Sequence, residues 1–110
     1  MRTKYDFDFD ILSGCFGDTK ISPTDIDLLV ERKSKFLVIE FKTEGVKVPD
    51  GQRWSLEALS RIGGFVVLIV WGYPPTEITA YEVIGRVDKE AHTLDELRSF
   101  VSRWFEYAND

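Results

Sequence analysis

The stretch TDIDLLVERKSKFLVIEFKTEG, residues 24–45, decides the fold that the sequence predicts. Two runs within it, 26–31 and 36–42, are rich in β-branched, leucine and aromatic residues, which is typical of strands. The polar segment RKSK between them is short enough for a tight turn, so we expect an antiparallel hairpin. Acids and a lysine lie at the ends of these apolar runs, and their placement needs an explanation.

The residues after the hairpin predict a helix and then a buried strand. Asp50 is a suitable N-cap for a helix over 51–62, and Gly63-Gly64 would end that helix. The continuously apolar run 65–71 is typical of a central strand covered on both faces. A strand–helix–strand path implies a right-handed crossover, so this strand should pair in parallel with the hairpin. The expected apolar face of the helix comprises Trp54, Leu56, Ala58, Leu59 and Ile62.

The N-terminal residues predict no single element, whereas the C-terminal residues predict a strand and a helix. The run YDFDFDILSGCF is compatible with either a strand or a short helix. Residues 76–84 predict a short edge strand, and Thr93-x-x-Glu96 is a capping box that opens an amphipathic C-terminal helix. The whole order predicts an α/β sandwich with a mixed central β-sheet flanked by helices.

Length and composition predict one folded domain over residues 1–110. No apolar run approaches the roughly 20 residues of a membrane helix, and the acidic first residues do not resemble a signal peptide. The single cysteine, Cys15, has no internal disulfide partner, so we expect a cytoplasmic protein.

Charge is unevenly distributed along the chain. The net charge is −5, which by itself disfavours a strong phosphate-binding surface. Residues 32–61, however, hold seven Lys or Arg and four acids, so this segment is +3 and the remainder is −8. The basic segment is the one that contains the hairpin's charged residues.

Strand parity places the hairpin's charges on one face. Glu40 and Lys42 are two residues apart and therefore share a face, as do Asp25 and Asp27 on the preceding strand. A turn at 33–34 sets Asp27 level with Glu40 or its neighbour, where facing residues lie about 5 Å apart. Two carboxylates at that separation repel each other unless a cation lies between them.

A hard divalent cation such as Mg²⁺ or Mn²⁺ would make these acids compatible. Mg²⁺ takes oxygen ligands and is often bound by one or two carboxylates plus water and substrate phosphate. The adjacent ammonium of Lys42 could then orient or polarise a metal-bound water, or neutralise charge that develops on a phosphate. The competing interpretation is an ordinary salt bridge between Glu40 and Lys42 at an exposed sheet surface.

The pattern Asp27, twelve residues, Glu40-x-Lys42, on two strands followed by a helix and an apolar strand, resembles the PD-(D/E)xK nuclease superfamily. This superfamily includes restriction endonucleases, Holliday-junction resolvases and small phage nucleases. The resemblance covers residues 24–72 and implies a restriction endonuclease-like fold of the αβββαβ type. It also implies a Mg²⁺-dependent nuclease that hydrolyses DNA phosphodiester bonds.

The resemblance assigns roles to individual residues. Asp27 and Glu40 would bind the metal with help from the Phe41 carbonyl, and Lys42 would be the catalytic lysine. The residues expected to contact substrate are Gln52, Arg53 and Lys47.

The chain departs from the superfamily pattern near its N-terminus. Relatives often carry a Glu on an N-terminal helix, but no Glu precedes Glu31 here. The acids Asp6, Asp8, Asp10 and Asp18 are candidate replacements, with Asp8 and Asp10 preferred, and Asp25 is a further candidate ligand. The departure and the acidic balance leave a second interpretation open, namely an inactive nuclease-fold module that binds nucleic acid or a partner protein. A homodimer or a larger nuclease complex is also compatible with so small a domain.

Overall fold

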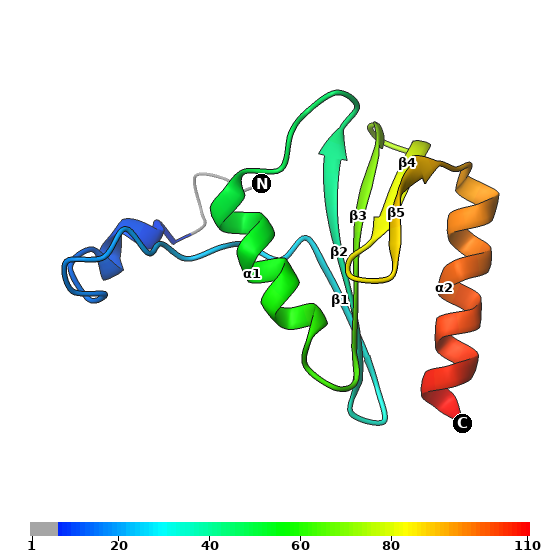
Figure 1. The fold of residues 1–110 in the computed structure, drawn as a ribbon, viewed down its shortest axis with the longest axis horizontal. Helices are drawn as coiled ribbons and strands as arrows, with labels where there is room; N and C mark the ends of the chain where they lie inside the picture. Colours follow the sequence, from blue (N-terminus) through cyan, green and yellow to red (C-terminus); the bar gives the residue numbers. More distant parts are fainter. Residues whose placement is uncertain (1–6) are drawn as a thin grey trace.

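A computed structural model describes residues 7–110, which form a five-stranded mixed sheet between two helices (Figure 1). The sheet order is β1-β2-β3-β4-β5; β2 and β3 are parallel and the other neighbours are antiparallel. No helix within this range is long and apolar enough to cross a bilayer. The elements in chain order are the 3₁₀ helix η1 (Phe9–Leu12), β1 (Leu28–Arg32), β2 (Lys35–Thr43), α1 (Asp50–Ser60), β3 (Phe65–Tyr73), β4 (Glu77–Val83), β5 (Val87–Ala91) and α2 (Leu94–Asn109).

The predicted hairpin is confirmed, and its turn is the two-residue kind that matches strand twist. Lys33 and Ser34 both have positive φ, 51° and 65°, as a type I′ turn requires. The Ser34 N–H donates to the Glu31 carboxylate at 2.8 Å, which ties the turn to β1. Leu28 lies opposite Ile39 in the resulting register.

Alternation along β2 and β3 separates two apolar layers. Leu37 and Ile39 face α2 in a core that includes Trp104. Val38 faces the opposite way, into a second core with Leu56 of α1. Figure 1 shows α1 and α2 on opposite faces of the sheet. The parallel pairing of β2 with β3 through α1 is therefore the crossover that the sequence predicts.

The prediction that residues 76–84 form an edge strand is wrong. β4 pairs with β3 on one side and with β5 on the other, with Ala80 opposite Ala91. Every residue of β5 is exposed, so its sequence VDKEA lacks the apolar alternation that identifies half-buried strands. Backbone pairing to β4 defines this strand rather than side-chain burial.

The expected apolar face of α1 is only partly correct. Leu56 is buried and Leu59 packs beside it, but Trp54 is 68% exposed and Ala58 is exposed as well. Trp54 lies two residues from Leu56, a rotation of about 200° around a helix, so its indole leaves the core when Leu56 enters it. Ile62 lies beyond the helix end at Ser60 and is half exposed.

The N-terminal segment adds no layer to the sandwich. Residues 9–12 form the one-turn 3₁₀ helix η1, which Asp8 caps by accepting from the Asp10 N–H at 2.9 Å. None of its residues is buried, and Figure 1 shows it projecting away from the sheet. Two strands precede α1 and three lie between α1 and α2, so the order differs from the expected αβββαβ arrangement.

Candidate functional site

Asp27 lies immediately before β1, and its side chain accepts a backbone hydrogen bond from β2 just beyond the end of the β1–β2 ladder. Its Oδ2 accepts from the Phe41 N–H at 2.9 Å, one residue beyond Glu40. Since Leu28 faces Ile39, the register places Asp27 beside Glu40, at the level that the hairpin argument predicts. A backbone hydrogen bond therefore fixes an otherwise exposed carboxylate next to the end of a buried strand.

Glu40 is a buried acid, and one of its two carboxylate oxygens has no hydrogen-bond partner among the described residues. It is 5% exposed, and its Oε1 lies 3.9 Å from the Lys42 ammonium. Its Oε2 is buried and accepts no hydrogen bond from any residue within 7–110. A buried carboxylate oxygen without a partner is costly, so a ligand that supplies positive charge would relieve that cost.

The electrostatics of Glu40 reflect this position. The pKa of Glu40 is raised to about 7, first by burial and then by the hydrogen bond and the charge of the neighbouring Asp27 carboxyl. Lys42 and Gln52 act in the opposite direction, because both stabilise the ionised form. Strongly raised acid pKa values gather at functional sites, where a charge must be available near neutral pH.

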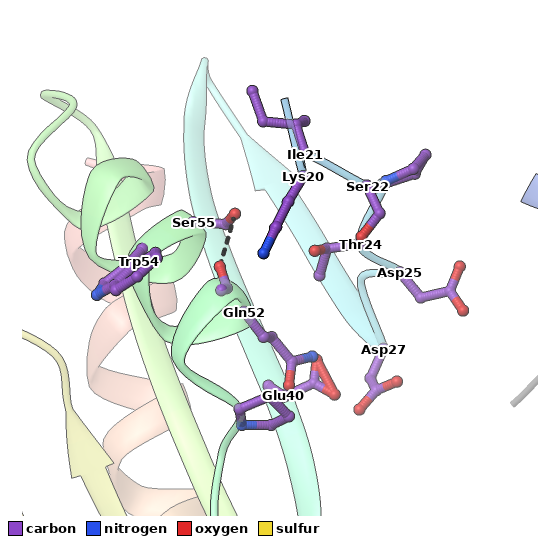
Figure 2. A pocket seen from close by; sticks show the side chains of 13 residues that line it. Lys20, Ile21, Ser22, Thr24, Asp25, Asp27, Glu40, Gln52, Trp54 and Ser55 are labelled. Atoms are coloured by element: carbon purple, nitrogen blue, oxygen red, sulfur yellow. Dashed lines mark hydrogen bonds between the residues drawn. The ribbon is translucent and has the colours of Figure 1, made fainter. Parts of the chain in front are cut away.

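The two acids line an open pocket of about 790 Å³ between the N-terminal segment and α1 (Figure 2). One wall is the extended segment 20–25, and the other is the first turns of α1. Figure 2 shows the Gln52 side chain directed toward Glu40 and Asp27. The residues of the α1 wall are Pro49, Gly51, Gln52, Trp54 and Ser55.

The site offers a metal ion two carboxylates. Asp27 and Glu40 are oxygen donors of the type that Mg²⁺ and Mn²⁺ accept, and one oxygen of Glu40 is unpartnered among the described residues. No three His, Cys, Asp or Glu side chains in residues 7–110 form a metal-binding group. The residues therefore fit a metal ion that is bound by two carboxylates and whose remaining coordination positions are taken by water and substrate oxygens.

Lys42 approaches Glu40 but lies beside a different hollow. It shares the α1 face with Glu40, as parity predicts, and its side chain is 18% exposed. Neither Lys42 nor Phe41 lines the pocket of Asp27 and Glu40. Both line a separate hollow of about 270 Å³, together with the Pro74–Pro75 turn. The Lys42 side chain is thus largely buried, with its ammonium group 3.9 Å from one carboxylate oxygen.

Two of the expected substrate contacts lie elsewhere. Arg53 forms a bidentate pair with the buried Glu82 of β4, one bond of which is 3.1 Å, and also approaches Glu57 at 3.4 Å. Lys47 is solvent-exposed and lies 3.8 Å from Asp50. Neither Arg53 nor Lys47 lines the pocket, whereas Gln52 does.

Of the additional candidate acids, some line the pocket and others do not. Asp25 lines the pocket with Asp27, while Asp8, Asp10 and Asp18 are exposed and do not line it. Asp8 is engaged as the cap of η1. Asp6 lies outside the described residues.

Two pocket residues lie outside the site that the sequence predicts. Lys20 follows the loop GDT in the sequence, and only the return of segment 20–25 past α1 brings it to the pocket. Trp54 is indistinguishable by spacing from a core residue of α1. Its exposure depends on which face of the helix packs against the sheet.

No family model, curated protein or solved structure matches this chain.

Proposed function

We propose that this protein is a metal-dependent nuclease of the PD-(D/E)xK type with a restriction endonuclease-like core, acting on DNA phosphodiester bonds. The observation that supports the proposal best is the buried Oε2 of Glu40, which has no hydrogen-bond partner among the described residues. Glu40 lies beside Asp27, and its other carboxylate oxygen, Oε1, is 3.9 Å from the Lys42 ammonium. A salt bridge alone leaves Oε2 unsatisfied, whereas a cation would use it.

In this proposal Asp27 and Glu40 hold Mg²⁺ or Mn²⁺. A bound ion would supply Lewis-acid polarisation of the phosphoryl group and would lower the pKa of water. The Phe41 N–H keeps Asp27 in place through its 2.9 Å hydrogen bond, so the acid is positioned before any ligand binds. The Phe41 carbonyl is the third protein oxygen that the resemblance implies.

Lys42 and Gln52 supply the remaining polar groups. The Lys42 ammonium would assist the attacking water or neutralise negative charge on a phosphoryl oxygen, because its side chain is largely buried and poorly screened by solvent. The Gln52 amide stabilises the ionised form of Glu40 and can orient a water or phosphate oxygen in the pocket.

The test compares cleavage of supercoiled plasmid and of labelled oligonucleotides by wild type, Asp27→Asn and Lys42→Ala, with Mg²⁺ or Mn²⁺. Cleavage by wild type and a loss of at least about 100-fold in each variant is expected, the range seen when one catalytic electrostatic group is removed. Lys47→Ala is the control, because Lys47 is an exposed lysine outside the pocket. If wild type leaves both substrates intact, or if the two variants cut as well as wild type, the proposal fails.

The second candidate is a nuclease-fold module without activity that binds nucleic acid or a partner protein. It is favoured by the two-acid donor set, since no third acid joins Asp27 and Glu40 in a metal-binding group within residues 7–110. Calorimetric titration separates the candidates. Mg²⁺ or Mn²⁺ binding that disappears in Asp27→Asn supports the enzyme, and absence of binding in wild type supports the module.

A further inference from the structure

The pocket that contains Asp27 and Glu40 also has a basic and an aromatic component. Among its lining residues Lys20 is the one cation, against the three acids Asp25, Asp27 and Glu40, so the lining carries a formal charge of 1 − 3 = −2. Trp54 borders the same pocket and is 68% exposed. These two side chains bear on what kind of substrate the pocket takes.

Lys20 is free to bind an anion. It forms no ion pair with any residue that the structure describes, and Figure 2 shows it extending between segment 20–25 and α1, toward Gln52 and Ser55. The first turn of α1 lies beside it, and its N-cap residue Pro49 makes no side-chain capping bond. Uncapped N–H groups at a helix start favour phosphate. The unpartnered Oε2 of the buried Glu40, which lines the same pocket, independently indicates a cationic ligand there, and such a cation would offset the negative charge that a phosphate meets in this lining.

Trp54 is an exposed aromatic residue that the packing of α1 against the sheet does not require. The α1 core contacts are made by Leu56 and Leu59, and Trp54 belongs to neither apolar cluster. Figure 2 places its indole on the outer side of α1, away from Asp27. A strand with a phosphate beside Lys20 would pass over this edge of the helix and could stack a neighbouring base on the indole.

We infer that the pocket takes a single nucleic-acid strand, with Lys20 binding a phosphate and Trp54 stacking an unpaired base. This deepens the proposed function and rests on it for the chemistry of the site. A duplex is bound mainly through many phosphate contacts, which a pocket lined by one cation and three acids cannot supply. Base–aromatic stacking is insensitive to sequence and needs a base whose face is free. Single-stranded DNA and RNA share that chemistry.

Binding is measured by the anisotropy of a fluorescein-labelled oligothymidylate, an oligouridylate of the same length and a blunt DNA duplex. Each titration is run in EDTA and again in Mg²⁺ with strand integrity checked on a gel. We expect the single strands to bind more tightly than the duplex. Strand binding should also quench protein fluorescence, because Trp71 and Trp104 are each only 5% exposed and Trp54 is the accessible indole.

Two variants test the two contacts, each with a matched control. Trp54→Ala should weaken strand binding about 5- to 140-fold, the equivalent of one stacked base, and Trp54→Phe should retain most of the affinity. Phe105→Ala, which removes a half-exposed aromatic of α2, should change nothing. Lys20→Ala should weaken binding and flatten its salt dependence by about 0.7 in log–log slope, whereas Lys47→Ala should not.

The outcomes separate this inference from the proposed nuclease activity. Strand binding in EDTA that depends on Trp54 supports the inference even when no cleavage occurs in Mg²⁺. Cleavage that depends on Asp27 but is unchanged in Trp54→Ala overturns the inference and leaves the nuclease proposal standing. Equal or tighter duplex binding, or no strand binding in either buffer, also overturns it.

Discussion

The backbone N–H of Phe41 donates a 2.9 Å hydrogen bond to Oδ2 of Asp27, fourteen residues earlier in the chain. The bond closes the open end of the β1–β2 hairpin with a side chain in place of a backbone carbonyl. It holds one carboxylate beside the buried carboxylate of Glu40, a pairing that repulsion between two acids would otherwise oppose.

The first prediction concerns stability and pH in EDTA. The pKa of Glu40 rises from 4.5 to about 7 on folding, so the folded state holds this proton more tightly than the unfolded state. Stability from this group is therefore fully present below about pH 4.5, is lost as pH rises toward 7, and stays lost above it. A shift of this size corresponds to at most about 3 kcal/mol.

The Glu40→Gln variant isolates that term, because glutamine does not ionise. Between about pH 5 and about pH 8 the free energy of unfolding should fall by about 1–3 kcal/mol more in wild type than in the variant. Urea unfolding followed by circular dichroism at both pH values measures the difference. Parallel pH dependence in the two proteins would show that Glu40 ionises normally.

The second prediction is that Mg²⁺ stabilises the protein at about pH 8. An ion held by Asp27 and Glu40 favours the ionised acids, and a ligand at 100 times its Kd adds about 2.7 kcal/mol of stability. Thermal unfolding with and without Mg²⁺ measures the effect. Asp27→Asn should abolish it, while the amide oxygen can still accept from the Phe41 N–H and preserve the fold.

Asp25→Asn is the control for that experiment. Asp25 lines the same pocket but is exposed and lies at the segment's outer part in Figure 2. Its variant should keep most of the Mg²⁺ effect. An equal loss in both variants would make Asp25 a ligand on the same footing as Asp27.

The third prediction separates a structural arginine from a substrate contact. Removing Arg53 leaves the buried Glu82 without its bidentate partner, so Arg53→Met should cost about 2 kcal/mol, less than for a fully buried pair because the Arg53 side chain is 36% exposed. Lys47→Met breaks an exposed pair and should cost less than about 0.5 kcal/mol. Chemical denaturation measures both, and similar costs for the two variants would contradict the assignment.

The fourth prediction concerns the irregular pairing of β3 with β4. At Gly72 a Cβ would lie 1.9 Å from the backbone oxygen of Glu77, next to the register shift after Trp71. Backbone cannot yield as a flexible side chain can, so Gly72→Ala should destabilise by at least about 2 kcal/mol or prevent folding. Gly63→Ala, where a Cβ meets nothing within 4 Å, should be nearly neutral. Expression yield and melting temperature distinguish the two.

The central part of the fold was predictable because its signals are local. Alternation and β-branched content define the hairpin and the run 65–71, and the Thr93–Glu96 capping box is present with both of its hydrogen bonds. β5 was missed because all its residues are exposed, and its pairing to β4 leaves no periodic pattern in the sequence. The exposure of Trp54 was missed for a related reason, since spacing does not say which helix face packs.

The sequence by itself determined that Asp27, Glu40 and Lys42 share one face near one level, because strand parity and a two-residue turn leave one register. Only the tertiary structure decided that Arg53 pairs with Glu82 and that Lys20 reaches the pocket. Arg53 and Glu82 are 29 residues apart, and the position of Lys20 depends on where its loop returns past α1. No local sequence pattern encodes either contact. The burial that raises the pKa of Glu40 is likewise a property of the layers packed around β2.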